Sequence, residues 1–174
     1  MLQTSTVEPD TLSLLKRLMN VPELKGASLV GGTALALKFG HRKSIDLDLF
    51  INENFNQKEI EKALEREFKN EFVYEPTKIT FVVFCNIQNI KVDIVHYPHP
   101  TINPTELVDE INFYSNADIS AMKINAILGR GKKKDFFDLA ELFKHYSLNQ
   151  IMDWHKQKYP SQMVLISIRM GLNP

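Results

Sequence analysis

Two aspartates separated by a single residue carry the clearest chemical signal in the chain. Asp46 and Asp48 belong to the segment Ile45–Ile51, in which every second residue is apolar. This alternation predicts a half-buried strand with both carboxylates on one face and their Cα atoms about 6.5–7 Å apart. Like charges at that spacing repel unless a cation lies between them, and Mg²⁺ or Mn²⁺ bound by carboxylates and substrate phosphates would supply one. Taken alone, the pair also fits the solvent-facing side of an edge strand.

A third carboxylate shifts this balance toward a metal site. In the segment Ile90–Val95 the apolar residues of one face alternate with the face that carries Asp93. If this strand neighbours the first, Asp46, Asp48 and Asp93 converge on one side of a sheet. Three carboxylates that hold two metal ions are typical of in-line phosphoryl and nucleotidyl transfer. We therefore predict all three as metal ligands and catalytic residues, with Asp93 also helping to deprotonate an acceptor hydroxyl.

A glycine pair, Gly31-Gly32, separates the apolar run Ala27–Val30 from the helical stretch Ala34–Phe39. The pattern predicts strand, tight turn and helix, with Gly40 as the helix stop. Backbone N–H groups at such a helix start bind phosphate, and glycine lets the phosphate approach. The pair matches neither a Walker A loop nor a dinucleotide fingerprint, and a turn without function is the alternative. The candidate phosphate-binding residues here are Gly31, Gly32, Thr33, Arg42 and Ser44.

These residues need a sheet to position them, and hydrophobic periodicity predicts an α+β half followed by a helical half. We expect an α+β core over residues 1–104 and a helical region over residues 105–174 that packs on it. In the first half, helices are expected over residues 11–19, 34–39 and 56–68, and strands over residues 27–30, 45–51, 71–75, 78–87 and 90–95, with a hairpin turn at Gln88-Asn89. In the second half, helices are expected over residues 118–128, 133–145, 149–158 and 162–170.

Composition excludes several classes of protein. The 174 residues are 44% apolar and 24% charged, which is ordinary for a globular chain. With 21 basic and 21 acidic residues the net charge is zero, so a generally basic nucleic-acid coat is excluded but a local patch is not. No apolar run suits a membrane span and the polar start is unlike a signal peptide, so we expect a cytoplasmic protein. The single Cys85 excludes an internal disulfide and a cysteine-based zinc site.

A family resemblance joins the glycine turn to the acidic strand. The string Val30–Leu37, followed by His41–Phe50, resembles the AbiEii/AbiGii toxin family of the DNA polymerase β-type nucleotidyltransferase superfamily, to which the MenT toxins are related. The resemblance implies a nucleotidyltransferase-type mixed sheet flanked by helices. It also implies that an acceptor attacks the α-phosphate of a nucleoside triphosphate with a divalent metal ion present. A tRNA 3′ end as acceptor, growth arrest and a cognate antitoxin as partner are further implications.

A second block is similar to the downstream motif of that family. It runs from Asp118 to Lys123, through Arg130, and on through Lys134–Leu139. The resemblance implies that Lys123 contacts the triphosphate, with Arg130 beside it, and that Asp135 or Asp138 serves the catalytic site. Helical spacing places Lys123 and Arg130 on one face, and the two aspartates on one face. A surface lysine and a capping or solvated helix start are the alternatives.

Three interpretations of function remain open. The leading one is a metal-dependent nucleotidyltransferase toxin that modifies RNA. The second keeps the chemistry but transfers the nucleotide to a hydroxyl of a partner protein, and the third is a non-catalytic module that binds a nucleotide or a partner. The basic run Gly129–Lys134 would hold RNA phosphates or the triphosphate, or form a solvated turn. Four phenylalanines are expected in the core, with a base-stacking platform as the alternative: Phe81, Phe84, Phe136 and Phe137.

Overall fold

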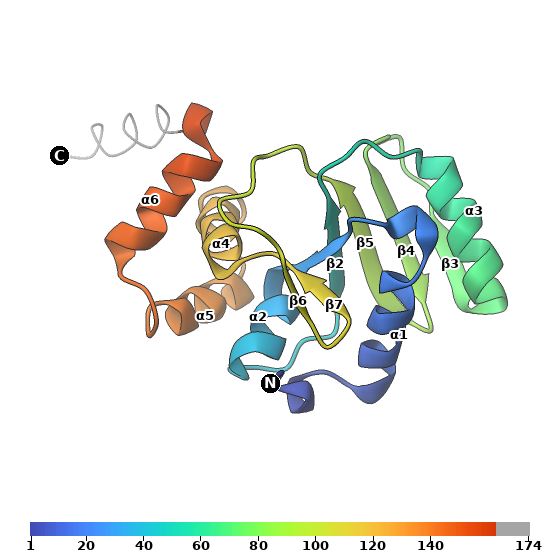
Figure 1. The fold of residues 1–174 in the computed structure, drawn as a ribbon, viewed down its shortest axis with the longest axis horizontal. Helices are drawn as coiled ribbons and strands as arrows, with labels where there is room; N and C mark the ends of the chain where they lie inside the picture. Colours follow the sequence, from blue (N-terminus) through green and yellow to red (C-terminus); the bar gives the residue numbers. More distant parts are fainter. Residues whose placement is uncertain (163–174) are drawn as a thin grey trace. The chain divides into compact units, whose positions relative to one another are not determined.

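The computed structural model describes residues 1–162, so most of the helix expected over residues 162–170 lies outside the described residues. The chain forms two compact units (Figure 1). The first unit combines Met1–Pro98 with Thr105–Tyr114, and the second combines His99–Pro104 with the chain from Ser115 onward. None of the helices in the described part of the chain has the length and apolarity needed to cross a membrane.

The expected mixture of helices and strands is confirmed. The helices of the first unit are α1 (Pro9–Met19), α2 (Gly31–Phe39) and α3 (Gln57–Phe68). Its strands are β1 (Ser28–Val30), β2 (Leu47–Ile51), β3 (Phe72–Glu75), β4 (Val82–Ile87), β5 (Ile90–His96), β6 (Glu106–Val108) and β7 (Ile111–Phe113). The second unit contains α4 (Asn116–Gly129), α5 (Lys133–Leu142) and α6 (Leu148–Lys158).

The seven strands form one mixed sheet in the order β3-β4-β5-β2-β1-β7-β6. The β2–β5 and β1–β7 pairs are parallel, and the other neighbouring pairs are antiparallel. The two strands with unusual acidic residues, β2 and β5, are therefore direct neighbours at the centre of the sheet. The antiparallel neighbour of β2 on its other side is β1, which leads into the glycine pair.

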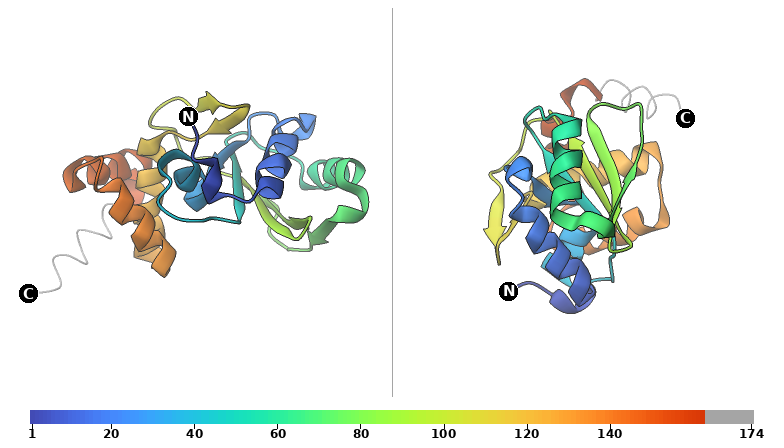
Figure 2. Two further views of the ribbon diagram at one scale, coloured as in Figure 1. Left: turned by 90° about the horizontal axis from the view of Figure 1, so that it is seen from below. Right: turned by 90° about the vertical axis from the view of Figure 1, so that its right-hand side faces the viewer.

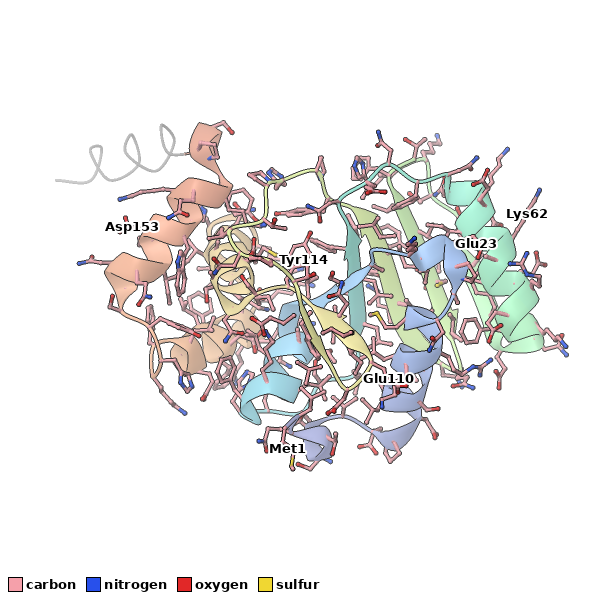
Figure 3. The ribbon with its side chains drawn as sticks, viewed as in Figure 1. Met1, Glu23, Lys62, Glu110, Tyr114 and Asp153 are labelled. Carbon is pink, nitrogen blue, oxygen red and sulfur yellow. The ribbon has the colours of Figure 1, made fainter. Side chains whose placement is uncertain are left out.

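One face of this sheet is apolar and forms the core of the first unit. Leu47, Leu49 and Ile51 of β2 are buried, whereas the residues between them are only half-buried. The amphipathic helices α1 and α3 lie on the same side of the sheet (Figure 2). Tyr114, which ends this unit, is buried and donates its hydroxyl hydrogen to Asn52 Oδ1 (Figure 3). Burial on one face leaves the other face for polar side chains.

The turn and capping residues follow the sequence predictions, while two strands begin later than expected. Gly40 ends α2 in the left-handed conformation with φ +74°, which glycine adopts without strain. Gln88 and Asn89 have φ of 55° and 63°, as a tight hairpin turn requires. The strand expected from residue 45 begins at Leu47, and Ile45 is 66% exposed rather than on the apolar face. The strand expected over residues 78–87 begins only at residue 82.

The hairpin of β6 and β7 contradicts the expectation that the chain is entirely helical beyond residue 104. The two strands are joined through Asp109 and Glu110, whose φ values are 49° and 67°. Hairpin turns of this geometry favour asparagine and glycine, so the Asp-Glu pair carries no strong turn signal. Each strand is also only three residues long, which is too short for a period of two to stand out.

A buried ion pair organises the second unit. Asp118 and Lys158 are both fully buried, and Lys158 Nζ lies 2.7 Å from Asp118 Oδ1. The carboxylate also accepts hydrogen bonds from the Ser115 hydroxyl at 2.6 Å and from the backbone N–H groups of Ile102 and Asn103. Buried charges persist when they are paired and hydrogen-bonded in this way. The pair therefore ties α4 and α6 to the loop that precedes β6.

A histidine in α6 is buried without a polar partner. His155 is fully buried, and neither ring nitrogen has a hydrogen-bond partner among the described residues. Its ring centroid lies 5.0 Å from that of Tyr159, and the ring centroid of His99 lies 5.1 Å from that of the same tyrosine. Burial lowers the pKa of His155, and burial together with the charge of Lys158 lowers the pKa of His99. In the folded protein both imidazoles therefore take up a proton less readily than a free histidine does.

We expect the free energy of unfolding of the second unit to fall as the pH drops below about 6.5. Below that value the unfolded chain takes up protons that folded His155 and His99 resist. The fully buried His155 contributes up to about 1.4 kcal/mol per pH unit, and the part-exposed His99 contributes less because solvent screens it. Urea unfolding at several pH values, followed by Trp154 fluorescence, measures the slope. His155→Leu should reduce it, and His145→Leu on the surface is the control. A slope unaffected by the His155 change would contradict the argument.

Candidate active site

The two central acidic strands place Asp48 and Asp93 side by side. In the parallel register of β2 and β5, Asp48 is the direct partner of Asp93. Both are half-buried and lie on the face opposite the buried Leu47 and Val92. Asp46 lies two residues before Asp48, just ahead of the strand. The sheet topology thus brings two of the three predicted carboxylates, Asp48 and Asp93, together on one face, and the third, Asp46, lies close to them in the chain.

A lysine lies among these carboxylates. Lys91 precedes Asp93 by two residues on the same face of β5, and its ammonium forms an ion pair with Asp93 Oδ2. Partial burial alone would lower the pKa of Lys91. The hydrogen bond to Asp93 and the negative charges of Asp93, Asp48 and Asp46 outweigh burial, so the pKa is raised. The ammonium also lies 5.9 Å from the ring centre of Phe84. A cation therefore already pairs with one of the carboxylates, Asp93.

The glycine pair lies against the same cluster. Val30, the last residue of β1, is the register partner of Asp48, and α2 begins at the next residue. Gly31 has φ +72°, and a Cβ built on it would lie 2.6 Å from Asp48 Oδ2. Only glycine fits this position without displacing the carboxylate. Because Val30 is the N-cap residue of α2 and the register partner of Asp48, the positive end of the helix dipole lies next to this carboxylate.

Thr33 and Ser44 anchor the segment before β2. The buried Thr33 hydroxyl donates to the backbone carbonyl of Asp46 and lies 2.9 Å from Ser44 Oγ. The backbone N–H of Ser44 donates to the Thr6 carbonyl at 3.0 Å. This network positions Asp46 relative to α2, so Thr33 acts through the backbone. Arg42 is half-buried, and its guanidinium donates to the Lys43 carbonyl at 3.0 Å.

The residues predicted from the downstream block form a cluster in the second unit. Lys123 Nζ lies 3.1 Å from Asp135 Oδ1 and 2.6 Å from Asp138 Oδ2, and both carboxylates are fully buried. Arg130 Nε lies 3.3 Å from Asp135 Oδ2. Burial alone would raise the pKa of Asp135. The hydrogen bonds and charges of Lys123 and Arg130 outweigh this effect, so the pKa is lower than usual. Lys123 is only 5% exposed and is not a surface lysine. The role of these residues toward a nucleotide stays a prediction.

The donor chemistry of the first cluster suits a hard divalent cation. Carboxylate oxygens are the ligands that Mg²⁺ and Mn²⁺ prefer, and Asp93 Oδ1 is buried without a hydrogen-bond partner. Across residues 1–162, no group of three or more His, Cys, Asp or Glu side chains is gathered closely enough to hold a metal ion. The donor atoms therefore suit such an ion by type, but the described residues do not gather three of them around one point, and Asp93 pairs with Lys91 instead. The three metal ligands stay a prediction.

Residues 13–162 match the family described as "Nucleotidyl transferase AbiEii toxin, Type IV TA system". The chain belongs to this AbiEii family. A relative in Aquifex aeolicus (strain VF5), aq_aa25, is 32% identical over 137 residues, which are 75% of this chain. The match spans 65% of the length of that relative.

Solved structures show the same fold at low sequence identity. JHP933 from Helicobacter pylori has a TM-score of 0.54 and 21% identity, over 92% of this chain and 79% of that protein. The antibiotic-resistance factor ANT(2'')-Ia has a TM-score of 0.62 and 12% identity, over 93% of this chain and 97% of that protein. The expected nucleotidyltransferase-type fold is thereby confirmed for this AbiEii family member.

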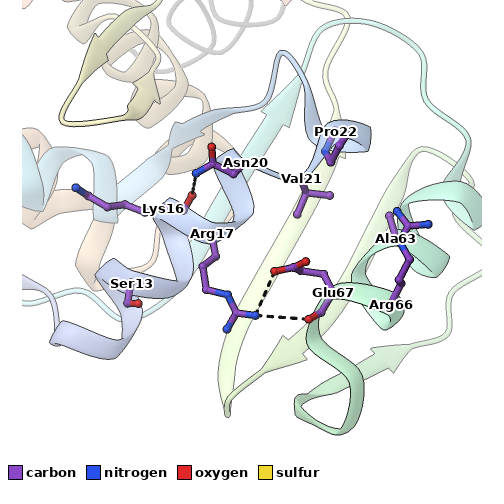
Figure 4. A pocket seen from close by; sticks show the side chains of 9 residues that line it. All are labelled: Ser13, Lys16, Arg17, Asn20, Val21, Pro22, Ala63, Arg66 and Glu67. Atoms are coloured by element: carbon purple, nitrogen blue, oxygen red, sulfur yellow. Dashed lines mark hydrogen bonds and ion pairs between the residues drawn. The ribbon is translucent and has the colours of Figure 1, made fainter.

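A groove of the first unit lies apart from the predicted site residues. Its volume is about 380 Å³, and residues of α1, α3 and the turn after α1 line it (Figure 4). Its cations already have acidic partners: Arg17 lies 3.2 Å from Glu67, and Arg66 lies 2.8 Å from Glu23. None of the predicted phosphate-binding or metal-binding residues lines it. The groove is therefore not the candidate active site.

Sequence reasoning overlooked Lys91. The available signal was its position two residues before Asp93, which places both side chains on the same face of a strand. The expectation of buried phenylalanines was also wrong in three places, because Phe81, Phe136 and Phe137 are 53%, 52% and 56% exposed. Phe84 is half-buried beside the acidic cluster. Aromatic residues therefore lie on the surface in both units.

We expect Lys123→Met to lower the free energy of unfolding of the second unit by about 3–5 kcal/mol, because it leaves two buried carboxylates without their ammonium. Urea unfolding measures the change, and adding Asp138→Asn should restore part of it. Lys156→Met is the control: its pair with Asp153 is exposed, so the effect should stay below about 1 kcal/mol. A Lys123→Met protein as stable as the unaltered one would show that the cluster does not depend on the ion pairs.

Proposed function

We propose that this AbiEii family member is a metal-dependent nucleotidyltransferase that transfers a nucleoside monophosphate from a nucleoside triphosphate to an acceptor. The observation that carries the proposal is the direct pairing of Asp48 with Asp93 beside the N-terminus of α2. Carboxylates next to a phosphate-binding helix start are the two components that nucleotidyl transfer needs at one place. Family membership supports the same chemistry.

Each part of the site has a role in this reaction. Asp46, Asp48 and Asp93 would hold Mg²⁺ or Mn²⁺, which when bound neutralises phosphate charge and polarises the phosphoryl oxygens. Backbone N–H groups at Gly31 and Gly32 bind a phosphate of the triphosphate. The acceptor hydroxyl attacks the α-phosphorus in line, its proton passes to Asp93, and the bond to the β-phosphate breaks so that pyrophosphate leaves.

Other residues support the site through position or charge. Thr33 and Ser44 hold Asp46 in place through their hydrogen bonds. Arg42, with its planar guanidinium, suits a phosphate contact. Lys123 and Arg130 are proposed to neutralise the triphosphate, with Asp135 and Asp138 orienting Lys123.

We infer that the acceptor is RNA, such as the tRNA 3′ end, and that the protein is the toxin of a toxin–antitoxin pair with a cognate antitoxin. Membership of a type IV toxin–antitoxin family supports the pair. A surface on α5 and the turn before it, here called the α5 surface, supports RNA: it consists of Lys132, Lys133, Lys134, Phe136 and Phe137, all exposed. Exposed aromatic rings beside lysines suit single-stranded RNA, because bases stack on the rings and phosphates pair with the ammonium groups.

The alternative acceptor is a hydroxyl group of a partner protein, and the non-catalytic alternative is a module that only binds. Incubation of the protein with radiolabelled nucleoside triphosphates, Mg²⁺ and either total tRNA or cell protein separates these functions. Label in tRNA supports the RNA acceptor, and label in protein alone replaces it with the second function. Absence of pyrophosphate release with every acceptor would leave only the binding module.

We expect Asp48→Asn to abolish label transfer, by at least about a hundredfold, while the protein stays folded. The change removes one charge from the metal-binding cluster and leaves the side-chain volume almost unchanged, and a metal supplies several kcal/mol of transition-state stabilisation. Asp109→Asn in the exposed β6–β7 turn is the matched control and should retain full activity. A folded Asp48→Asn protein with full activity would exclude the metal role of this residue.

We expect Phe137→Ala and Lys133→Glu each to weaken tRNA binding by about tenfold, because base stacking contributes about 1–3 kcal/mol per base and a reversed charge repels phosphate. Lys133 Nζ lies 5.7 Å from the centre of the Phe137 ring, so the two changes test one surface. Filter binding at fixed salt measures the affinity, and Lys62→Glu on α3 is the charge-matched control. Unchanged binding by both variants would remove the α5 surface from the RNA-binding role.

A further inference from the structure

A row of side chains crosses the polar face of the sheet and places an aromatic ring beside Asp93. Asp48 is the register partner of Asp93, Asp93 is the partner of Phe84 on β4, and Phe84 is the partner of Glu75 on β3. The strands β2, β5, β4 and β3 follow one another in the sheet (Figure 1). Register partners lie on one face of a sheet, so Phe84 lies directly next to Asp93 on the face that carries the carboxylates.

The surroundings of this ring are polar and charged. Phe84 is half-buried, and in the row it lies between Asp93 and the exposed Glu75. The ammonium of Lys91 lies 5.9 Å from the ring centre and pairs with Asp93, which reduces the negative charge that an approaching phosphate would meet. A partly exposed aromatic ring with a lysine beside it is the combination that binds the bases and phosphates of single-stranded nucleic acids.

The position of Phe84 in the sheet distinguishes the acceptor from the nucleotide as its ligand. The glycine pair follows β1, and β1 and β4 lie on opposite sides of the β2–β5 pair. In phosphoryl transfer the attacking and the leaving oxygens lie in line on opposite sides of the transferred phosphorus. With the leaving phosphates held at the glycine pair, the acceptor approaches from the side of β4 and therefore meets Phe84.

We propose that the base of the terminal nucleoside of an RNA acceptor stacks on Phe84 and thereby places the attacking ribose hydroxyl at Asp93. The inference rests on the proposed function, because it takes RNA as the acceptor and Asp93 as the group that receives the proton. Neighbouring strands lie about 4.8 Å apart, so one nucleoside, with its base and its hydroxyls on a single sugar ring, spans the distance from Phe84 to Asp93. Stacking accepts every base, so Phe84 selects a nucleoside end rather than a particular sequence.

A binding experiment tests the contact without requiring catalysis. A synthetic RNA hairpin with a single-stranded 3′ end is prepared with and without the base of its last nucleoside, and filter binding measures the affinity of each form. The unaltered protein should bind the form with the base about tenfold more tightly. Phe84→Leu should bind both forms alike, because the ring is gone, whereas Phe84→Tyr keeps a ring and should retain most of the preference. Phe81→Leu is the matched control, since Phe81 is 53% exposed but lies outside β4.

Steady-state label transfer provides a second measurement. Phe84→Leu should raise the KM for RNA about tenfold and leave the KM for the nucleoside triphosphate unchanged. A rise in the KM for the triphosphate alone would overturn the inference, because the ring would then contact the nucleotide. An active Phe84→Leu protein with the same preference for the terminal base as the unaltered protein would overturn the role of Phe84 and leave the proposed function in place. Absence of transfer to RNA by the unaltered protein would overturn the RNA acceptor of the proposed function, and this inference with it.

Discussion

The repulsion between two carboxylates held side by side is the constraint on which the candidate site depends. Parallel pairing of β2 with β5 makes Asp48 and Asp93 direct neighbours, and the packed core beneath Leu47 and Val92 prevents either strand from shifting. Moving a strand by one residue would turn its apolar side chains to the opposite face. The charges therefore cannot move apart, and a cation must accompany them.

The elements around this pair each supply a different positive influence. The N-terminus of α2 brings the positive end of its dipole to Asp48, and Gly31 allows an approach that any Cβ would block. Lys91 brings a full charge from the same strand as Asp93. A site assembled in this way favours anionic phosphate and a hard cation together, because each offsets the charge of the other. This mutual dependence is the physical basis for proposing nucleotidyl transfer.

Buried carboxylates in the second unit are also paired with cations. Asp118 is paired with Lys158, and both Asp135 and Asp138 are paired with Lys123. Each pair is buried and connects two or more helices, so it specifies how they pack as well as contributing charge balance. Removal of one partner leaves a buried charge without its counter-ion. The stability of the second unit therefore depends on residues that are also proposed to contact the triphosphate.

The sequence by itself determined the local elements and the residue types of the site. Alternation of Leu47, Asp48 and Leu49 specifies a strand with its carboxylate on the polar face, and Gly40 specifies where α2 ends, since both depend only on neighbours along the chain. The motif positions from Gly31 to Asp48 were sufficient to indicate the family. The β6–β7 hairpin escaped prediction because its turn uses Asp109 and Glu110 rather than residues that favour positive φ.

Only the tertiary structure decided which charges meet. Strand order is set by packing and by hydrogen bonds between segments far apart in the chain, so no local pattern reveals that β2 pairs with β5 in the register that joins Asp48 to Asp93. The same pairing placed Lys91 among the carboxylates, and helix packing drew Lys123 out of solvent onto Asp135 and Asp138. The chain sequence supplies the charges, and the long-range contacts of the fold determine their partners, because electrostatic energy depends on distance in space and not on separation in sequence.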